Sequence, residues 1–321
     1  MAVSAINKRT IGIRILNEYY ETTQATDSIQ PELFGFDRMK PSMIKIFLAA
    51  TVISLSLNAQ TGYKVFEDVE FSNPGGVSLK LDAHIPEGKG PFPTIILVHG
   101  GGWSAGTKQA NFIKPLFPLL DSTGYTWFTV DYRLVPKHPF PAAADDVEAA
   151  ITFVKKNAKK YKVNPKRIAI MGESAGGHLV ELVGARNRQG LAAVVSFYGP
   201  LDIPEFTRQR FGDKPMTENM KQFFLVDEMN PAAWRKLKEA SGSAYLSRKT
   251  PPFLLIHGTK DEAVPYSLSD YDMKLLQAKG VKVERITVTD GIHGVVNWEK
   301  DPKFHTYKQP LVEWLRKTLG Q

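Results

Sequence analysis

The pentapeptide G-E-S-A-G at 172–176 constrains the fold of this chain more than any other stretch. It follows an apolar run at 167–171 and precedes a stretch at 177–186 whose residues are compatible with a helix. Between a strand and a helix, G-x-S-x-G forms a sharp, strained turn that presents the serine hydroxyl at the end of a sheet. Glycines on both sides of the serine let the strand and the helix pass without a Cβ clash. We therefore expect Ser174 to be a nucleophile at the end of a buried strand.

Apolar runs that alternate with helical patterns predict an α/β fold. Most of these runs are apolar on both faces, which is typical of central parallel strands covered on both sides. A strong turn signal at 73–76 joins the first two alternating stretches into an antiparallel hairpin. The predicted strands are 63–72, 78–85, 94–98, 126–130, 168–171, 192–198, 252–256 and 281–288, with helices from 141, from 177 and around 307–319. This order predicts a mostly parallel central sheet with helices on both faces.

The segment 201–249 does not fit this alternation. It is long and polar, and it contains aromatic side chains that we expect to be exposed: Phe206, Phe211, Phe223, Phe224 and Trp234. A connection this long between two sheet strands is usually functional. We predict a lid inserted over the active site, and the alternative is a plain helical excursion.

A second glycine-rich stretch, H-G-G-G-W at 99–103, directly follows the predicted strand 94–98. Acyl transfer requires backbone N–H groups aimed at the oxyanion that forms on the carbonyl oxygen, and glycines let the backbone approach that closely. We expect the amides of Gly101, Gly102 and Ala175 to form this oxyanion hole. A phosphate-binding turn is the alternative, but the G-x-G-x-x-G and Walker spacings are both missing.

Side chains beside these motifs are candidates for supporting roles. Trp103 and Glu173 are candidates for the substrate pocket, and packing in the core is the alternative for Trp103. Arg133 is expected to pair with a carboxylate beneath the site, either Asp145 or Asp146.

Two turns after the last predicted strands supply an acid and a base, which a serine nucleophile needs near neutral pH. Asp261 lies in H-G-T-K-D-E-A-V-P and His293 in D-G-I-H-G, in the order serine, acid, histidine that this arrangement requires. We expect Asp261 to orient His293, with Glu262 and Asp290 as rival acids. The remaining histidines are expected to be structural: His84, His99, His138, His178, His257 and His305. This chemistry needs neither a metal nor an organic cofactor.

The composition excludes several classes of site. The chain has no cysteine, which rules out disulfides, thiolate metal sites and a cysteine nucleophile. The formal net charge is +8, but four lysines between 155 and 160 lie on the polar side of a helical pattern. A solvated helix face explains them better than a nucleic-acid surface does, so we expect no nucleic-acid partner.

Residues 39–59 have the pattern of a secretory signal peptide. A basic stretch at 39–45 precedes a 12-residue apolar run at 46–57, and Ala59 supplies a small residue for cleavage before Gln60. The run is too short for a membrane span, which needs about 20 apolar residues, and a buried core helix is the alternative. We expect residues 1–38 to be an upstream extension without a fold, with translation starting at Met39 or Met43. The predicted hydrolase domain is then 60–321.

Five ordered motifs together resemble the α/β-hydrolase superfamily. They are H-G-G-G-W, D-Y-R-L-x-P-x-H-P-F-P-A, G-E-S-A-G-G, H-G-x-x-D-x-x-V-P and G-x-H-G, and they span about 63–320. Within the superfamily, the chain resembles the hormone-sensitive-lipase-like carboxylesterases and the bacterial feruloyl and acetyl esterases. The lipase-like group usually carries D-P-L-x-D at the acid, so the form around Asp261 favours the feruloyl/acetyl branch.

This resemblance implies a serine esterase that hydrolyses short-chain acyl esters, and the predicted signal peptide implies that it is exported, to the periplasm or the extracellular space. Its substrate would be a small-molecule or carbohydrate-linked ester, such as acetyl or feruloyl groups on plant polysaccharide. A general lipase-like carboxylesterase, and a serine peptidase or amidase on the same fold, are the alternatives. A non-catalytic module should have lost a triad residue, and none is lost here. The oligomeric state is left open by the sequence.

Overall fold

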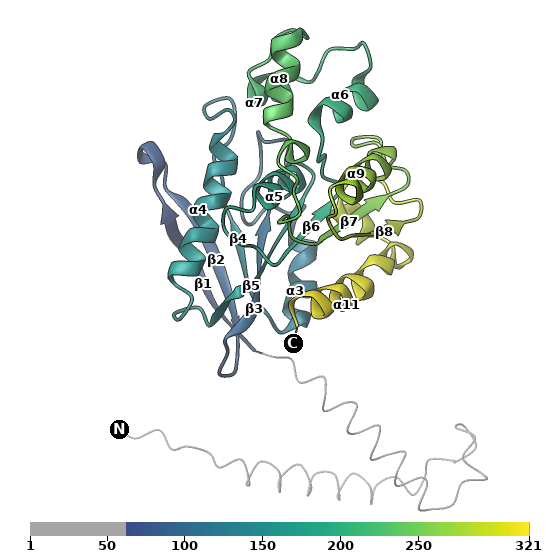
Figure 1. Cartoon of the computed structure of the whole chain (residues 1–321). Helices are drawn as coiled ribbons and strands as arrows, with labels where there is room; N and C mark the ends of the chain where they lie inside the picture. Colours follow the sequence, from purple (N-terminus) through teal and green to yellow (C-terminus); the bar gives the residue numbers. More distant parts are fainter. Residues whose placement is uncertain (1–61, 321) are drawn as a thin grey trace, which may run out of the picture. The chain divides into compact units, whose positions relative to one another are not determined.

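A computed structural model describes residues 62–320, so the predicted extension 1–38 and the predicted signal peptide 39–59 lie outside the described residues. The described chain forms an eight-stranded sheet with helices on both faces (Figure 1). The strands are β1 (Tyr63–Ser72), β2 (Leu79–Pro86), β3 (Phe92–Val98), β4 (Thr126–Val130), β5 (Val163–Glu173), β6 (Ala193–Phe197), β7 (Phe253–Gly258) and β8 (Val283–Val288).

The sheet is parallel except around β2. Its strand order is β1-β2-β4-β3-β5-β6-β7-β8, and β2 pairs antiparallel with both β1 and β4. All pairs from β4 to β8 are parallel, so the carboxyl ends of β3, β5 and β7 lie at the same edge of the sheet. The predicted hairpin and the predicted mostly parallel sheet are both confirmed.

The main helices are α3 (Phe117–Thr123), α4 (Ala142–Lys156), α5 (Ala175–Arg186), α9 (Ser267–Ala278) and α11 (Lys308–Leu319), with a short turn α10 (Val295–Trp298). Side chains that alternate along each strand fill two separate cores. On β3, Ile96 and Val98 pack into the core shared with α4, α5 and α9, whereas Ile95 and Leu97 face α3 and α11. Burying both faces stabilises the sheet by roughly 25 cal/mol for each Å² of apolar surface removed from water. None of the helices among the described residues is both long and apolar enough to cross a membrane.

The segment 201–249 folds into three further helices, α6 (Ile203–Phe211), α7 (Glu218–Phe224) and α8 (Pro231–Glu239), which lie together at the top of Figure 1. Asp202 caps α6 by accepting the Glu205 N–H at 2.9 Å. The expectation of exposed aromatic side chains is wrong for Phe206, Phe223 and Phe224, which are buried. The physical reason is that short polar helices must still bury one apolar face to be stable.

Candidate active site

Ser174 stands between β5 and α5 with a strained backbone. Its φ of 54° and ψ of −117° lie in a region that residues with a side chain seldom occupy. The turn is possible because its neighbours have no Cβ. A Cβ on Gly172 would lie 2.4 Å from the carbonyl oxygen of Gly176, and one on Gly176 would lie 2.3 Å from that of Val98. These close approaches fix the serine at the carboxyl edge of the sheet.

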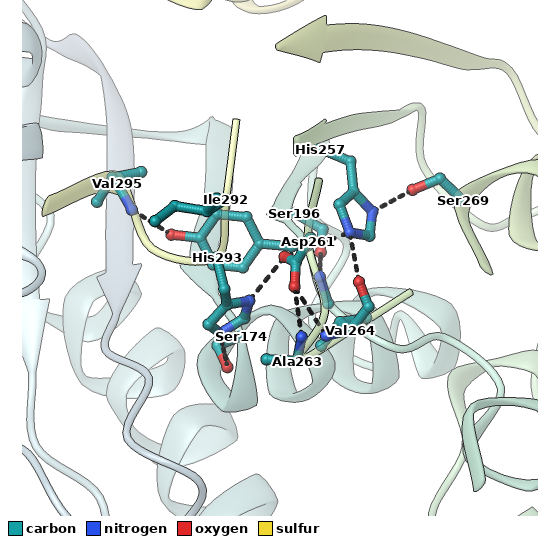
Figure 2. A network of polar contacts seen from close by, with 12 residues as sticks. Ser174, Ser196, His257, Asp261, Ala263, Val264, Ser269, Ile292, His293 and Val295 are labelled. Carbon is teal, nitrogen blue, oxygen red and sulfur yellow. Dashed lines mark hydrogen bonds and ion pairs between the residues drawn. The ribbon is translucent and has the colours of Figure 1, made fainter. Parts of the chain in front are cut away.

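Ser174, His293 and Asp261 come together in one line of hydrogen bonds, as Figure 2 shows. Nδ1 of His293 donates to Oδ2 of Asp261 at 2.7 Å. With that proton on Nδ1, Nε2 accepts the Ser174 hydroxyl at a distance of 3.0 Å. His293 is therefore in the tautomer and position that a general base requires.

Asp261 is held ionised although its carboxylate is buried. Burial acts to raise its pKa, but contacts with His257 and His293 outweigh this effect, so the pKa of Asp261 lies well below its usual range. The amides of Ala263 and Val264 both donate to Oδ1 at 2.9 Å. A carboxylate that accepts this many hydrogen bonds is ready to orient and stabilise an imidazolium.

The rival acids lie elsewhere. The Glu262 side chain is exposed, and Asp290 pairs with Lys260 at 2.9 Å rather than with His293.

Tyr198, which sequence reasoning missed, packs against the His293 ring with the ring centroids 4.6 Å apart. Its hydroxyl accepts the Val295 N–H at 2.8 Å, which ties the loop after His293 to the sheet.

The glycine-rich loop after β3 places backbone amides beside the serine. Gly101 and Gly102 have φ of +98° and +59°, and a Cβ on Gly101 would lie 2.0 Å from the Ala105 carbonyl oxygen. Within the described residues, neither of these two amides donates to another protein group. Gly102 and Ala175, the first residue of α5, line the same pocket as Ser174, and Gly101 directly precedes Gly102 in the loop. Free donors at this edge are what an oxyanion requires.

His99 supports this loop through a hydrogen bond and a ring contact. Its Nδ1 donates to the Gly100 carbonyl at 2.8 Å, and its ring stacks on Tyr132 with centroids 4.2 Å apart. The Tyr132 hydroxyl lies 3.0 Å from the carbonyl oxygens of both His99 and Gly100. Burial lowers the pKa of His99 to about 4, so the ring stays neutral near neutral pH.

Trp103 is packed in the core and also lines the pocket. Its indole Nε1 donates to Nδ1 of His178 at 3.2 Å, and Nε2 of His178 donates to the Ala240 carbonyl at 2.7 Å. The ring stacks on Phe223 of α7 with centroids 4.8 Å apart. Burial lowers the pKa of His178 to about 4, which keeps it neutral as this chain of hydrogen bonds requires. Trp103 therefore joins the glycine-rich loop to the segment 201–249.

The prediction that Glu173 lines the substrate pocket is wrong. Its side chain is buried behind the nucleophile, where Oε1 accepts the Gly100 N–H at 2.8 Å. Burial raises the pKa of Glu173, while His293, the Gly100 amide and Tyr198 act in the opposite direction. The alternation of side chains along β5 explains the error, because residues next to each other in a strand point to opposite faces. Glu173 fixes the glycine-rich loop to the end of β5.

A pocket of about 220 Å³ opens at Ser174. One side, here called the catalytic wall, consists of Gly102, Ser174, Ala175 and His293. The opposite side, here called the helical wall, comes from α6, α7 and the loop between them. Its lining residues are Phe206, Arg210, Phe211, Thr217, Asn219 and Met220. Sequence reasoning missed Arg210, Thr217, Asn219 and Met220, and the length of the segment was the one signal that pointed to them.

Arg133 supports the site from outside the pocket. Its guanidinium pairs with Asp146 rather than Asp145, with Nη2 and Oδ1 2.8 Å apart, and its backbone N–H donates to Oδ2 of the same carboxylate at 2.8 Å. Over the described part of the chain, no three side chains of the metal-binding types cluster closely enough to hold a metal ion. The site itself presents a serine, a histidine, a carboxylate and backbone amides.

Comparison with known proteins places this geometry among esterases. The BD-FAE family model matches residues 81–276. The carboxylic ester hydrolase LipN of Mycobacterium tuberculosis is 34% identical over 261 residues, which cover 74% of this chain and 67% of LipN. The probable carboxylic ester hydrolase LipM of the same organism is 31% identical over 188 residues. That match covers 55% of this chain but less than half, 43%, of LipM.

A solved structure shares the fold over most of the described chain. The acetyl ester-xyloside bifunctional hydrolase from Caldicellulosiruptor lactoaceticus superimposes with a TM-score of 0.65 at 26% identity. The match covers 77% of this chain and 90% of that protein. The predicted resemblance to α/β-hydrolases of the lipase-like and feruloyl/acetyl esterase type is confirmed.

Proposed function

The chain belongs to the BD-FAE family of α/β-hydrolases, and from that premise we propose that it is a serine carboxylic ester hydrolase. One observation carries the proposal: the line of hydrogen bonds from Ser174 through His293 to the buried Asp261. A serine hydroxyl bonded to an imidazole whose other nitrogen is held by a carboxylate is an activated nucleophile.

The first half of the reaction acylates the serine. Oγ of Ser174 attacks the ester carbonyl carbon while Nε2 of His293 takes the hydroxyl proton. The negative charge that develops on the carbonyl oxygen is held by the amides of Gly102 and Ala175 and by that of Gly101, each worth about 10²–10³ in rate where such a donor has been removed. Nε2 of His293 then gives its proton to the leaving alcohol.

The second half hydrolyses the acyl-enzyme. Water loses a proton to His293 as its oxygen attacks the acyl carbon, and the same amides hold the second oxyanion. Collapse of this intermediate returns the proton to Oγ of Ser174 and releases the carboxylic acid. Asp261 stabilises the imidazolium in both halves without taking its proton.

The size of the pocket favours a short acyl chain. Its 220 Å³ lies below the range of about 300–1,000 Å³ that is typical of pockets for drug-sized ligands. The likeness to the acetyl ester-xyloside hydrolase supports an acetylated carbohydrate as substrate, whereas the carboxylic ester hydrolases LipM and LipN support carboxylic esters in general. We favour the carbohydrate-linked ester, because the acid motif around Asp261 has the feruloyl/acetyl form.

The proposed place of action is outside the cytoplasm. The basic stretch, the short apolar run and Ala59 support export with cleavage before Gln60. Expression of the full chain in a bacterial host, followed by fractionation and N-terminal sequencing, tests this directly. A product that begins at Gln60 outside the cytoplasm is expected, and an uncleaved cytoplasmic product would contradict export.

The catalytic proposal is tested with Ser174→Ala. We expect nitrophenyl acetate turnover to fall by about 10⁴ or more, and labelling by a fluorophosphonate to disappear, because both depend on the serine oxygen. The circular dichroism spectrum should be unchanged, since the alanine fits wherever the serine does. Retention of wild-type turnover by this variant would overturn the assignment.

The substrate class is tested with a panel of nitrophenyl acetate, butyrate, octanoate and ferulate beside acetylated xylan and an anilide. Preference for acetate or ferulate together with xylan deacylation is the expected result. Preference for butyrate or longer esters, with xylan untouched, would favour the lipase-like alternative. Anilide turnover faster than ester turnover would favour an amidase or peptidase.

A further inference from the structure

The helical wall of the pocket contains a cation that the ester chemistry does not use. Arg210, at the end of α6, lines the pocket with Ser174 and His293. Apart from the His293 imidazole, it is the one ionisable side chain among the described residues that line this pocket. None of the described residues that line the pocket carries a carboxylate, and Arg210 is exposed, so its guanidinium lies at the mouth of the pocket.

Arg210 differs from its neighbour on the same helix. Arg208 pairs with Glu205, with Nη1 and Oε2 3.0 Å apart, and lies over the Trp234 ring. Within the described residues, Arg210 has no carboxylate within 4.0 Å. Its guanidinium carbon lies over the Phe211 ring, 5.8 Å from the ring centroid, a contact that uses none of its N–H donors. A guanidinium beside an apolar surface and without an internal partner keeps its donors available for a ligand.

A second free donor lies on the same wall. Thr217 lines the pocket, and its side chain makes no capping hydrogen bond at the start of α7. The neighbouring Asn219 instead donates its amide to the Ser104 hydroxyl at 2.7 Å, which ties α7 to the glycine-rich loop. The helical wall is thus fixed to the glycine-rich loop, while the side chains of Arg210 and Thr217 make no hydrogen bond to another described residue.

We propose that Arg210, assisted by the Thr217 hydroxyl, is a specificity site for acyl esters that carry a carboxylate. Arg forms paired, parallel hydrogen bonds with a carboxylate, and these charge-assisted bonds are stronger than neutral ones. The apolar part of the ester packs on Phe206, Phe211 and Met220 while its anionic group reaches Arg210 at the mouth. This inference rests on the proposed ester hydrolysis and adds to it a preference for anionic esters over neutral ones.

The carboxylate could belong to the acyl group or to the alcohol, and two matched substrate pairs separate these sources. On the alcohol side, 3-carboxyphenyl acetate is compared with 3-carbamoylphenyl acetate. On the acyl side, the mono-nitrophenyl ester of adipic acid is compared with that of adipamic acid. Each pair differs by a carboxylate against a neutral amide of nearly the same shape, so the ratio of the two kcat/KM values isolates the charge.

The wild-type enzyme should prefer the anionic member of at least one pair by about 3- to 10-fold, the range of a partly exposed charge pair. Arg210→Gln should bring that ratio to about one, and Arg210→Lys should restore part of it because the charge remains but the planar fork is lost. Arg208→Gln is the matched control, on the same helix but outside the pocket, and should keep the wild-type ratio.

A wild-type ratio of one in both pairs, or an Arg210→Gln ratio equal to that of the wild type, would overturn the inference. The neutral esters report separately on the proposed function. If the wild-type enzyme hydrolyses neither member of either pair, ester hydrolysis itself has failed. If it hydrolyses the neutral esters without preferring the anionic ones, ester hydrolysis stands and the specificity site is rejected.

Discussion

The two walls of the pocket are built in different ways. On the catalytic wall, the turn that carries Ser174 is held by backbone packed against backbone, so that a single added methyl on Gly176 would collide with two carbonyl oxygens, at 2.3 and 2.4 Å. The helical wall is held by side chains, through the stacking of Phe223 on Trp103 and the hydrogen bond from Asn219 to Ser104. Where backbone packs against backbone, no side-chain atom can be added. Where side chains pack together, one residue can be replaced by another of similar size. We infer that substitutions on the catalytic wall remove the reaction, whereas substitutions on the helical wall change which esters are hydrolysed.

The largest expected effect is on the catalytic wall. Asp261→Asn should lower kcat by about 10³–10⁴, because an amide can no longer hold His293 in the tautomer that accepts the serine proton. Glu262→Gln is the matched control, since that side chain is exposed and should leave kcat within about twofold. Nitrophenyl acetate kinetics measure both. Equal losses in the two variants would show that Asp261 is not the orienting acid.

A pair of glycine substitutions compares the rigidity of the two walls. Gly176→Ala should cost about 4 kcal/mol of unfolding free energy and most of the activity, because the Cβ has no space between two carbonyls. Gly212→Ala, after α6, should cost about 1–3 kcal/mol, because its φ of +56° is strained but nothing lies within 4 Å of the Cβ. Denaturant unfolding measures both changes. Similar costs would contradict the proposed difference between the walls.

Two buried acids, Glu181 and Asp272, lie where α5 and α9 meet the start of the segment 201–249. Burial raises the pKa of Glu181 on α5 to about 8, and it raises that of Asp272 on α9, where Glu181, Asp202 and Glu205 act in the same direction. Oδ2 of Asp272 accepts the N–H of Leu201, the first residue of the segment that carries the helical wall, at 3.4 Å. Burial of both carboxyls therefore favours their neutral forms in the folded protein.

These acids should make the fold sensitive to alkali. An acid whose pKa is raised by folding contributes stability that is fully present below its unfolded pKa of about 4.5 and is lost as pH rises through about 8. Between pH 5 and 9, the unfolding free energy of the Glu181→Gln variant should fall by roughly 1–4 kcal/mol less than that of the wild type. Urea titrations across this range measure the slope. If the unfolding free energy of the variant depends on pH as steeply as that of the wild type, Glu181 is not the cause of this pH dependence.

The smallest expected effect lies on the helical wall. Met220→Ala enlarges the pocket without touching the catalytic wall, so the ratio of kcat/KM for nitrophenyl octanoate over acetate should rise by about 3- to 10-fold. Met229→Ala is the control, because Met229 is exposed and outside the pocket. Rates on the ester series provide the measurement. A loss of kcat on all esters alike would indicate that this wall also positions the catalytic groups.

Sequence patterns predicted the strands and the catalytic positions because each depends on local constraints. The order of serine, acid and histidine follows from which strand ends meet at one edge of a parallel sheet, and the runs of apolar residues locate those strands. The predictions for Glu173, Phe206, Phe223 and Phe224 are wrong for the opposite reason. Whether a side chain faces a pocket, a neighbouring loop or a helix depends on residues far away in the chain.

The sequence by itself determined the α/β fold, the strained turn at Ser174, the free glycine amides and the positions of Asp261 and His293. Each of these depends on a short motif, because the conformational freedom of glycine, the periodicity of strands and the residue preferences of turns are local properties of a few residues. Only the tertiary structure decided that Trp103 links to His178, that Glu173 anchors the glycine-rich loop, and that Arg210 lines the same pocket as Ser174. Those contacts join segments tens of residues apart, and packing of the whole molecule, not local propensity, brings them together.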